Sequence, residues 1–73
     1  MPLVEVKLIE GVFTKEQKQQ MVTKLTDAIV AIEGENMRGV TTVIIEDVQS
    51  GDWAIGGKPL TTADVKAIAA GKN

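Results

Sequence analysis

The sequence contains no cysteine and no histidine among its 73 residues. Without cysteine, no disulfide can stabilise the fold and no thiolate can serve as a nucleophile. Without histidine, a Ser-His-Asp triad is excluded, and the usual nitrogen and sulfur ligands of metals are both missing. The phosphate-binding patterns GxGxxG and GxxxxGKS/T are absent as well. We therefore expect no metal site and no cofactor, and any proton transfer must use another kind of group.

Aromatic residues and clustered charge are also scarce. Trp53 and Phe13 are the only aromatic residues, the formal net charge is -2, and the eight basic residues are spread along the chain. Because nucleic-acid binding needs a basic surface or stacking platforms, we do not expect it. No apolar run approaches the length of a membrane span and no signal peptide is visible, so we expect a cytoplasmic protein without a membrane partner.

The chain is short but apolar. Hydrophobic residues make up 44% of it, which is too many for a disordered protein and predicts one domain spanning residues 1–73. A chain of this size buries a limited core by itself, and small scaffolds without disulfides or metals commonly depend on oligomerisation. We therefore expect an oligomer.

The first half of the sequence predicts a strand followed by a helix. "PLVEVKLIE" alternates with a period of two over residues 2–9, as a strand does. Thr14 and Gln17 have the spacing of a capping box, and apolar residues then recur at helical spacing over residues 15–32. Gly34 is a plausible end of this helix.

The second half predicts a strand, a turn and a short helix. "VTTVIIEDV", residues 40–48, is rich in β-branched residues and predicts a strand that is apolar on both faces, parallel to the first and reached by a right-handed crossover. The three glycines in "SGDWAIGGKPL" predict a loop or tight hairpin. Residues 61–73 predict a C-terminal helix, with Thr61 and Asp64 at capping-box spacing.

Pro2 has two interpretations, a structural and a chemical one. Proline is tolerated at the start of a strand, where no ladder donor is lost. If Met1 is removed, however, Pro2 carries a free secondary amine, and α-amino groups titrate at about 7.7 to 8.0. An apolar pocket lowers the pKa of an amine further, which gives a general base near neutral pH. Glu46 and Asp47, adjacent on a strand, are interpreted as solvated charges on opposite faces.

Several segments, in this order, resemble the tautomerase superfamily, in its short 4-oxalocrotonate tautomerase-like group. They are "PLVEVKLIEG" at the start, "EQK" at the opening of the helix, "VTTVIIEDV" in the second strand and "GDWAIGG" in the glycine-rich segment. The resemblance covers a core of about residues 2–60, and residues 61–73 form a C-terminal helix or tail to which nothing is transferred.

The resemblance implies an α+β fold: a β-α-β protomer with parallel strands, a glycine-rich hairpin and a short C-terminal helix. It implies assembly to a homodimer or homohexamer, with the site between subunits. Pro2 would be the catalytic base of a keto-enol tautomerase that acts on a small enol or 2-keto acid. Trp53 would be the hydrophobic wall near the proline, and Ile9 would lie in an apolar pocket position.

This chain departs from the family at the expected arginines. Family members that act on dicarboxylates carry an arginine after the first strand's glycine, where this chain has Val12 and Phe13 in a loop one residue longer. A second arginine is expected where Thr42 stands, and Arg38 belongs to the preceding turn. Thr42 can still donate a hydrogen bond in the pocket, while Lys7 and Lys58 are interpreted as surface residues. The alternative function is therefore a catalytically idle oligomer of the same fold, acting as a structural or small-ligand-binding module.

Overall fold

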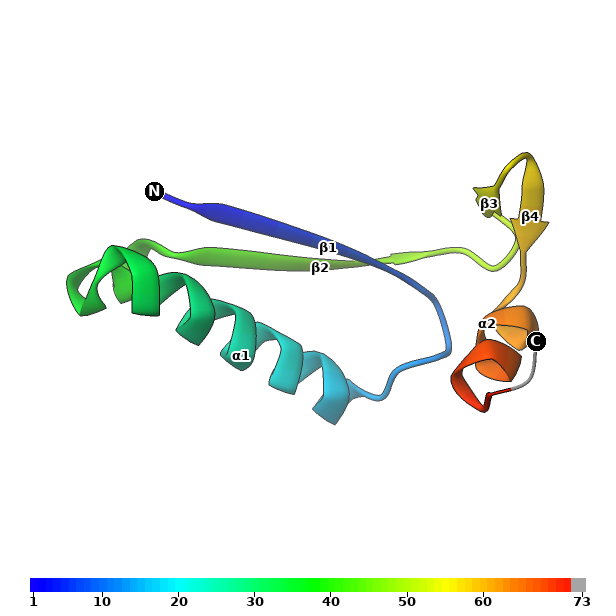
Figure 1. Ribbon diagram of the computed structural model, residues 1–73, viewed down its shortest axis with the longest axis horizontal. Coiled ribbons are helices and arrows are strands. Elements are labelled where there is room, and N and C mark those ends of the chain that lie inside the picture. The colour runs from blue at the N-terminus through cyan, green and yellow to red at the C-terminus, as the bar shows by residue number, and fades with distance from the viewer. Residues whose placement is uncertain (72–73) are drawn as a thin grey trace. The chain divides into compact units, whose positions relative to one another are not determined.

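The computed structural model describes residues 1–71 (Figure 1). The order of elements is β1 (Leu3–Ile9), α1 (Lys15–Glu33), the 3-10 helix η1 (Glu35–Val40), β2 (Thr42–Val48), β3 (Trp53–Ile55), β4 (Lys58–Leu60) and α2 (Thr62–Ala69). Every element predicted from the sequence is present, but the C-terminal helix predicted over residues 61–73 is shorter, Thr62–Ala69, and residues 72–73 of that prediction lie outside the described residues. The predicted start of the second strand at residue 40 was two residues early, because Val40 is the last residue of η1.

The described residues form two compact units. The first contains residues 1–6 and 14–46, and the second contains residues 7–13 and 47–71. The division falls within β1 and β2, so each of these strands contributes residues to both units.

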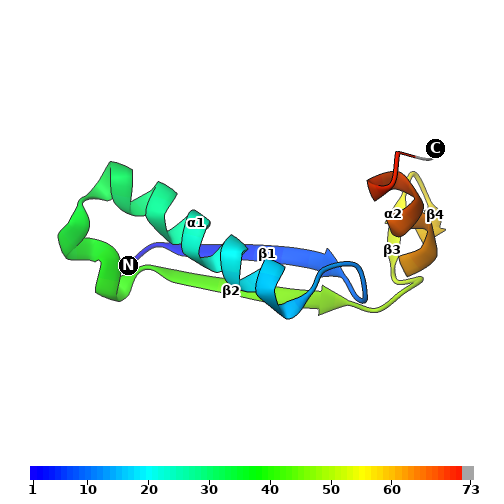
Figure 2. The same cartoon turned by 90° about the horizontal axis from the view of Figure 1, so that it is seen from below.

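The strands β1 and β2 pair in parallel. In the first unit, the Thr42 N–H donates to the Pro2 carbonyl oxygen at 3.1 Å; in the second, the Glu10 N–H donates to the Val48 carbonyl oxygen at 2.8 Å. Both bonds fit one parallel register in which Leu3 lies opposite Thr42. Figures 1 and 2 show α1 running along one face of this two-stranded sheet, as expected for the crossover helix of a β-α-β unit.

The helix α1 begins at the predicted residue, Lys15, and ends at Glu33, one residue beyond the predicted end, with Gly34 as the predicted cap. Thr14 Oγ1 accepts from the Gln17 N–H at 3.1 Å, and the Thr14 N–H donates to Gln17 Oε1 at 2.8 Å. This reciprocal capping box satisfies two backbone N–H groups at the helix start, those of Thr14 and Gln17. The helix ends where the Gly34 N–H donates to the Val30 carbonyl oxygen at 2.8 Å.

We expect Thr14→Ala to lower the free energy of unfolding by about 1 kcal/mol, because it removes the N-cap acceptor. Urea denaturation followed by circular dichroism measures this change. Thr23→Ala is the matched control, since Thr23 is exposed within the same helix and alanine has the higher helix propensity there. Equal destabilisation by both substitutions would contradict a capping role.

Few residues are buried within one chain. Among residues 1–71, the buried hydrophobic residues are Ile9, 4% exposed, and Val30, 5% exposed. Leu3 is 55% exposed and Ile44 is 40% exposed, and the register places both on the same face of the sheet. The hydrophobic strand residues that alternate with them, Val4, Val6, Leu8, Val43 and Ile45, are half-buried. The uncovered face of the β1–β2 sheet therefore exposes Leu3 and Ile44 beside the charged residues Glu5, Lys7 and Glu46.

The second unit contains a hairpin and the C-terminal helix. β3 and β4 are antiparallel, with Trp53 opposite Leu60. Gly56 and Gly57 form the two-residue turn between them with φ of 59° and 82°, the left-handed pair that a type I′ hairpin requires. α2 starts with the predicted capping box: Thr61 Oγ1 accepts from the Asp64 N–H at 3.1 Å and the Thr61 N–H donates to Asp64 Oδ2 at 2.9 Å.

Candidate functional site

An apolar pocket of about 140 Å³ lies within the second unit. It is formed by the end of β1, the loop after β1, the first strand of the hairpin and α2. The lining residues are Lys7, Leu8, Ile9, Phe13, Trp53 and Val65. Five of these side chains are hydrophobic, so the pocket can exclude water from an apolar group, and Lys7 is the one charged residue that lines it.

Hydrogen bonds fix the start of α2 against the end of β1. The Ser50 N–H donates to Glu10 Oε1 at 3.1 Å, and the Thr62 N–H donates to Ser50 Oγ at 2.9 Å. Thr62 Oγ1 donates to the Glu10 carbonyl oxygen at 2.7 Å. Because these three residues bond to one another, the first turn of α2 is held in place by Glu10 and Ser50 from the loops that follow β1 and β2.

Gly11 lies where the loop after β1 comes close to Thr62 of α2. Its φ is 78°, and a Cβ built on it would lie 3.1 Å from Thr62 Cγ2. A side chain at this position would therefore be strained by the backbone conformation and would press on the residue that anchors α2.

The four residues that the sequence predicts for the site fall into two pairs. Ile9 and Trp53 both line the pocket. Pro2 and Thr42 belong to the first unit, where the Thr42 N–H donates to the Pro2 carbonyl oxygen. Pro2 is half-buried and follows Met1, which is 90% exposed; while Met1 is present, the Pro2 nitrogen is an amide without basicity. The roles of all four residues stay predictions.

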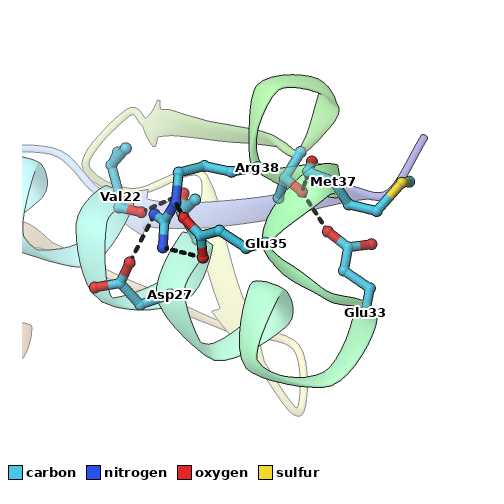
Figure 3. A network of polar contacts seen from close by, with 8 residues as sticks. Val22, Asp27, Glu33, Glu35, Met37 and Arg38 are labelled. Carbon is cyan, nitrogen blue, oxygen red and sulfur yellow. Dashed lines mark hydrogen bonds and ion pairs between the residues drawn. The ribbon is translucent and has the colours of Figure 1, made fainter.

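Arg38 takes part in a separate polar network, shown in Figure 3. Its Nε donates to Glu35 Oε1 at 2.7 Å, its Nη2 to Glu35 Oε2 at 3.3 Å and its Nη1 to Asp27 Oδ1 at 2.8 Å. These bonds tie η1 to α1. The arginine therefore has a structural role in η1, in agreement with its predicted place in the turn before the second strand.

The same network changes the acidity of its members. The hydrogen bond from Arg38 is the main reason that the pKa of Glu35 lies below its ordinary value, and the two carboxylates raise the pKa of Arg38. Beside it, the Thr41 hydroxyl contacts the Glu33 carboxylate and donates to the Met37 carbonyl oxygen at 2.8 Å (Figure 3).

We expect the stability difference between the native sequence and Glu35→Gln to shrink as the pH falls. A carboxyl group with a lowered pKa stabilises the fold above its ordinary pKa of 4.5, and this contribution is lost as the pH falls through the lowered value. Urea midpoints measured across the acid range test this. Asp52→Asn, in an exposed loop, is the control; a gap for Glu35→Gln that stays constant with pH would contradict the linkage.

Two residues that form walls of the pocket were not predicted from the sequence, and the position of Lys7 was predicted only in part. Phe13 and Val65 line the pocket, although neither was predicted to do so. The signals were the extra residue after Gly11, which carries one of the two aromatic side chains, and the apolar spacing in the C-terminal helix. Lys7 is exposed, as interpreted, but it also lines the pocket, whereas Lys58 is exposed on β4 away from the lining.

Three further features bear on function. Glu46 and Asp47 are both exposed, and their interpretation as solvated charges stays a prediction. Over the described part of the chain, no three acidic, histidine or cysteine side chains are grouped so that they could hold a metal ion. Within residues 1–71, neither helix is both apolar and long enough to span a bilayer.

Comparison with known proteins gives consistent matches. The Tautomerase family model, described as "Tautomerase enzyme", matches residues 2–63. The chain is 36% identical over 61 residues to "Probable tautomerase K2" of Dickeya dadantii, a match that covers 84% of this chain and 90% of that protein. It is 38% identical over 61 residues to "2-hydroxymuconate tautomerase" of Bacillus subtilis, with 84% of this chain and 95% of that protein covered.

A solved structure shares the fold. It comes from a study of the 4-oxalocrotonate tautomerase isozymes of Methylibium petroleiphilum and superposes with a TM-score of 0.69 at 32% identity. The match covers 88% of this chain and 97% of the other. The agreement extends over the α+β arrangement of parallel strands, crossover helix and hairpin described above.

Proposed function

This chain belongs to the tautomerase family, in its 4-oxalocrotonate tautomerase-like group, and on that premise we propose that it interconverts the enol and keto forms of a small 2-keto acid with Pro2 as general base. The family identifies it as an isomerase of the tautomerase type. The observation that best supports the finer proposal is that Ile9 and Trp53, far apart in sequence, line one apolar pocket.

The chemistry of Pro2 follows from its position next to Met1. Once Met1 is removed, the nitrogen is a secondary amine whose pKa, about 7.7 to 8.0 for an α-amino group, is lowered further in apolar surroundings. In ketonisation the neutral nitrogen accepts the enol hydroxyl proton and then delivers a proton to carbon as the keto group forms. The nitrogen is neutral again at the end, so the cycle needs no other reactant.

We further propose that a second copy of the chain completes the site. Pro2 directly precedes β1 and Ile9 is its last residue. A strand rises about 3.3 Å per residue, so seven residues separate the two by roughly 23 Å, whereas a base must come within about 3.2 Å of the proton it takes. The exposed hydrophobic residues Leu3 and Ile44 on the uncovered face support a homodimer or homohexamer.

The substrate is proposed to be a monoacid, because the arginines that would bind a second carboxylate are replaced by Val12 and Thr42. We expect kcat/KM for phenylenolpyruvate to exceed that for 2-hydroxymuconate by about tenfold, the size of one charge-assisted hydrogen bond. Thr42→Arg should narrow the gap, while Thr23→Arg, on the exposed side of α1, should not. A strong preference of the native chain for the dicarboxylate would mean that another cation replaces the arginines.

Two measurements test the proposal. The intact mass of the protein should lack Met1, because a retained Met1 leaves Pro2 without a basic nitrogen. Ketonisation of phenylenolpyruvate should then be catalysed by the mature protein. If Met1 is retained, or if the mature protein does not accelerate ketonisation, the chain is an idle module of the same fold that binds a ligand or assembles without chemistry.

A further inference from the structure

We propose that Glu10 is a positioning residue that holds two walls of the pocket in place through hydrogen bonds to Ser50 and Thr62. One wall carries Trp53 and the other carries Val65. We call Glu10, Ser50 and Thr62 the Glu10 cluster. This inference rests on the proposed function, since the pocket is the site named there, and it concerns the residues that set the shape of that site.

Glu10 is the point at which three segments of the second unit meet. Its N–H donates to the Val48 carbonyl oxygen at 2.8 Å, which joins the ends of β1 and β2. Its side chain accepts from the Ser50 N–H at 3.1 Å, and its carbonyl oxygen accepts from Thr62 Oγ1 at 2.7 Å. The Thr62 N–H donates to Ser50 Oγ at 2.9 Å. Each residue of the cluster is therefore bonded to both of the others.

The cluster fixes the backbone that carries Trp53. Ser50 lies three residues before Trp53, in the loop that leads into β3. In the same loop, the Gly51 N–H donates to the Leu60 carbonyl oxygen at 2.9 Å, and Leu60 is the residue paired with Trp53 in the hairpin. A shift of Ser50 therefore moves the start of β3 and the Trp53 side chain with it.

The cluster matters most for α2, because little else holds this helix. The helix has eight residues and none of them is buried. Helices shorter than about 12–15 residues are marginal in water without tertiary contacts. Thr62 and Val65 are three residues apart, so they share one side of the helix, and both are half-buried. The hydrogen bonds of Thr62 therefore keep Val65 at the pocket, in a part of the chain beyond the family match of residues 2–63.

Gly11 allows the cluster to close. It directly follows Glu10, and a Cβ at this position would lie 3.1 Å from Thr62 Cγ2. The loop after β1 thus comes as near to Thr62 as a glycine permits. This close approach keeps the Thr62 hydroxyl within hydrogen-bonding distance of the Glu10 carbonyl oxygen.

Loosening of the walls should affect substrate binding rather than proton transfer. The three residues of the cluster do not line the pocket, so they act only through the walls. The walls contact the substrate in its ground state and in its transition state alike, so their displacement raises KM and leaves kcat unchanged. Loss of one hydrogen bond shifts the equilibrium between closed and displaced walls by about fivefold. Because α2 is otherwise weakly held, we expect KM to rise by about two- to fivefold.

The first test separates the hydrogen bond of Thr62 from its packing. Thr62→Val keeps the shape of the side chain and loses the donor to Glu10, whereas Thr62→Ser keeps the donor and loses the methyl group near Gly11. We would measure acrylamide quenching of Trp53, the chain's single tryptophan, in the mature full-length protein without denaturant. Quenching should increase in Thr62→Val and stay at the native level in Thr62→Ser.

The opposite results are equally clear. No increase in Thr62→Val, or an equal increase in Thr62→Ser, would overturn the positioning role. A contribution to global stability alone would shift the urea midpoint and leave quenching of the folded state unchanged, so this signal distinguishes positioning from stability.

The second test concerns the side chain of Glu10. Glu10→Gln keeps an oxygen that accepts from the Ser50 N–H, and Glu10→Ala does not. In Glu10→Ala, KM for phenylenolpyruvate should rise by about two- to fivefold with kcat unchanged, while Glu10→Gln stays near the native values. Glu16→Ala, which removes an exposed carboxylate from α1, is the matched control and should change neither constant. Equal effects of alanine and glutamine, or a fall in kcat at constant KM, would contradict this role.

The outcomes separate this inference from the proposed function. If the mature protein does not ketonise phenylenolpyruvate, the proposed function fails, and the quenching series still decides the role of the Glu10 cluster. If the native chain is active but quenching is the same in all variants, the positioning role fails and the proposed function stands.

Discussion

Pro2→Ala is expected to lower kcat/KM for ketonisation of phenylenolpyruvate by about 100-fold, near the lower end of the 10²–10⁴ that positioned acid–base groups contribute. The loss stays near this end because alanine also permits removal of Met1 and leaves a primary amine in place. What is lost is the pyrrolidine ring, which ties the nitrogen to the side chain and so holds it in one direction.

A second variant removes the basic nitrogen itself. Insertion of one glycine between Met1 and Pro2 converts the Pro2 nitrogen to an amide while the side chain and β1 are kept. We expect a larger loss of activity, toward 10⁴-fold. The pH profile of kcat/KM provides the control: it should rise as the Pro2 amine loses its proton in the native chain and lose this limb in the glycine variant. Equal rates for all three proteins would exclude Pro2 as the base.

Leu3→Glu is expected to dissociate the assembly and abolish activity with it. Leu3 is 55% exposed within the chain, and burial of a leucine against a second copy stabilises an interface by about 1.5–3 kcal/mol. The variant loses this contribution and also places an additional carboxylate in the proposed interface without a partner, which costs more. The change therefore exceeds a hundredfold in the association constant of a symmetric dimer, because each chain carries the substitution once.

Light scattering and size-exclusion chromatography at several concentrations measure this effect. Thr23→Glu is the matched control, because it adds the same charge at an exposed polar position of α1. The native chain should elute well above its 7.8 kDa mass. A native chain that is monomeric and active would exclude a site completed by a second copy.

Local features of this fold were predictable because local sequence determines them. The Thr14–Gln17 and Thr61–Asp64 pairs form capping boxes at the expected residues, since the spacing of three fixes the geometry. The hairpin turn at Gly56–Gly57 follows from the left-handed conformation that glycine accepts. The start of β2 was displaced because η1 continues to Val40, and a 3-10 turn has no strong sequence signature.

The pocket was predictable only in part, because its walls come from distant segments. The alternation in β1 puts Ile9 on the same face as Glu5 and Lys7, which are exposed, yet Ile9 is buried because the second unit packs around it. The family resemblance supplied Ile9 and Trp53. It could not supply Phe13 or Val65, since the loop is longer here and the helix lies beyond the shared core.

The parallel register also has a kinetic consequence. Leu3 lies opposite Thr42, about forty residues away in sequence, so the sheet closes a long loop, whereas both helices start from caps that span three residues. Contacts between residues that are close in sequence form before contacts between distant residues. The reason is that closing a long loop costs chain entropy before any strand pairing is gained. We therefore expect α1 to form early and strand pairing to limit the folding rate. Until the strands pair, β1 and β2 present unpaired edges, so refolding at high protein concentration should favour aggregation over assembly.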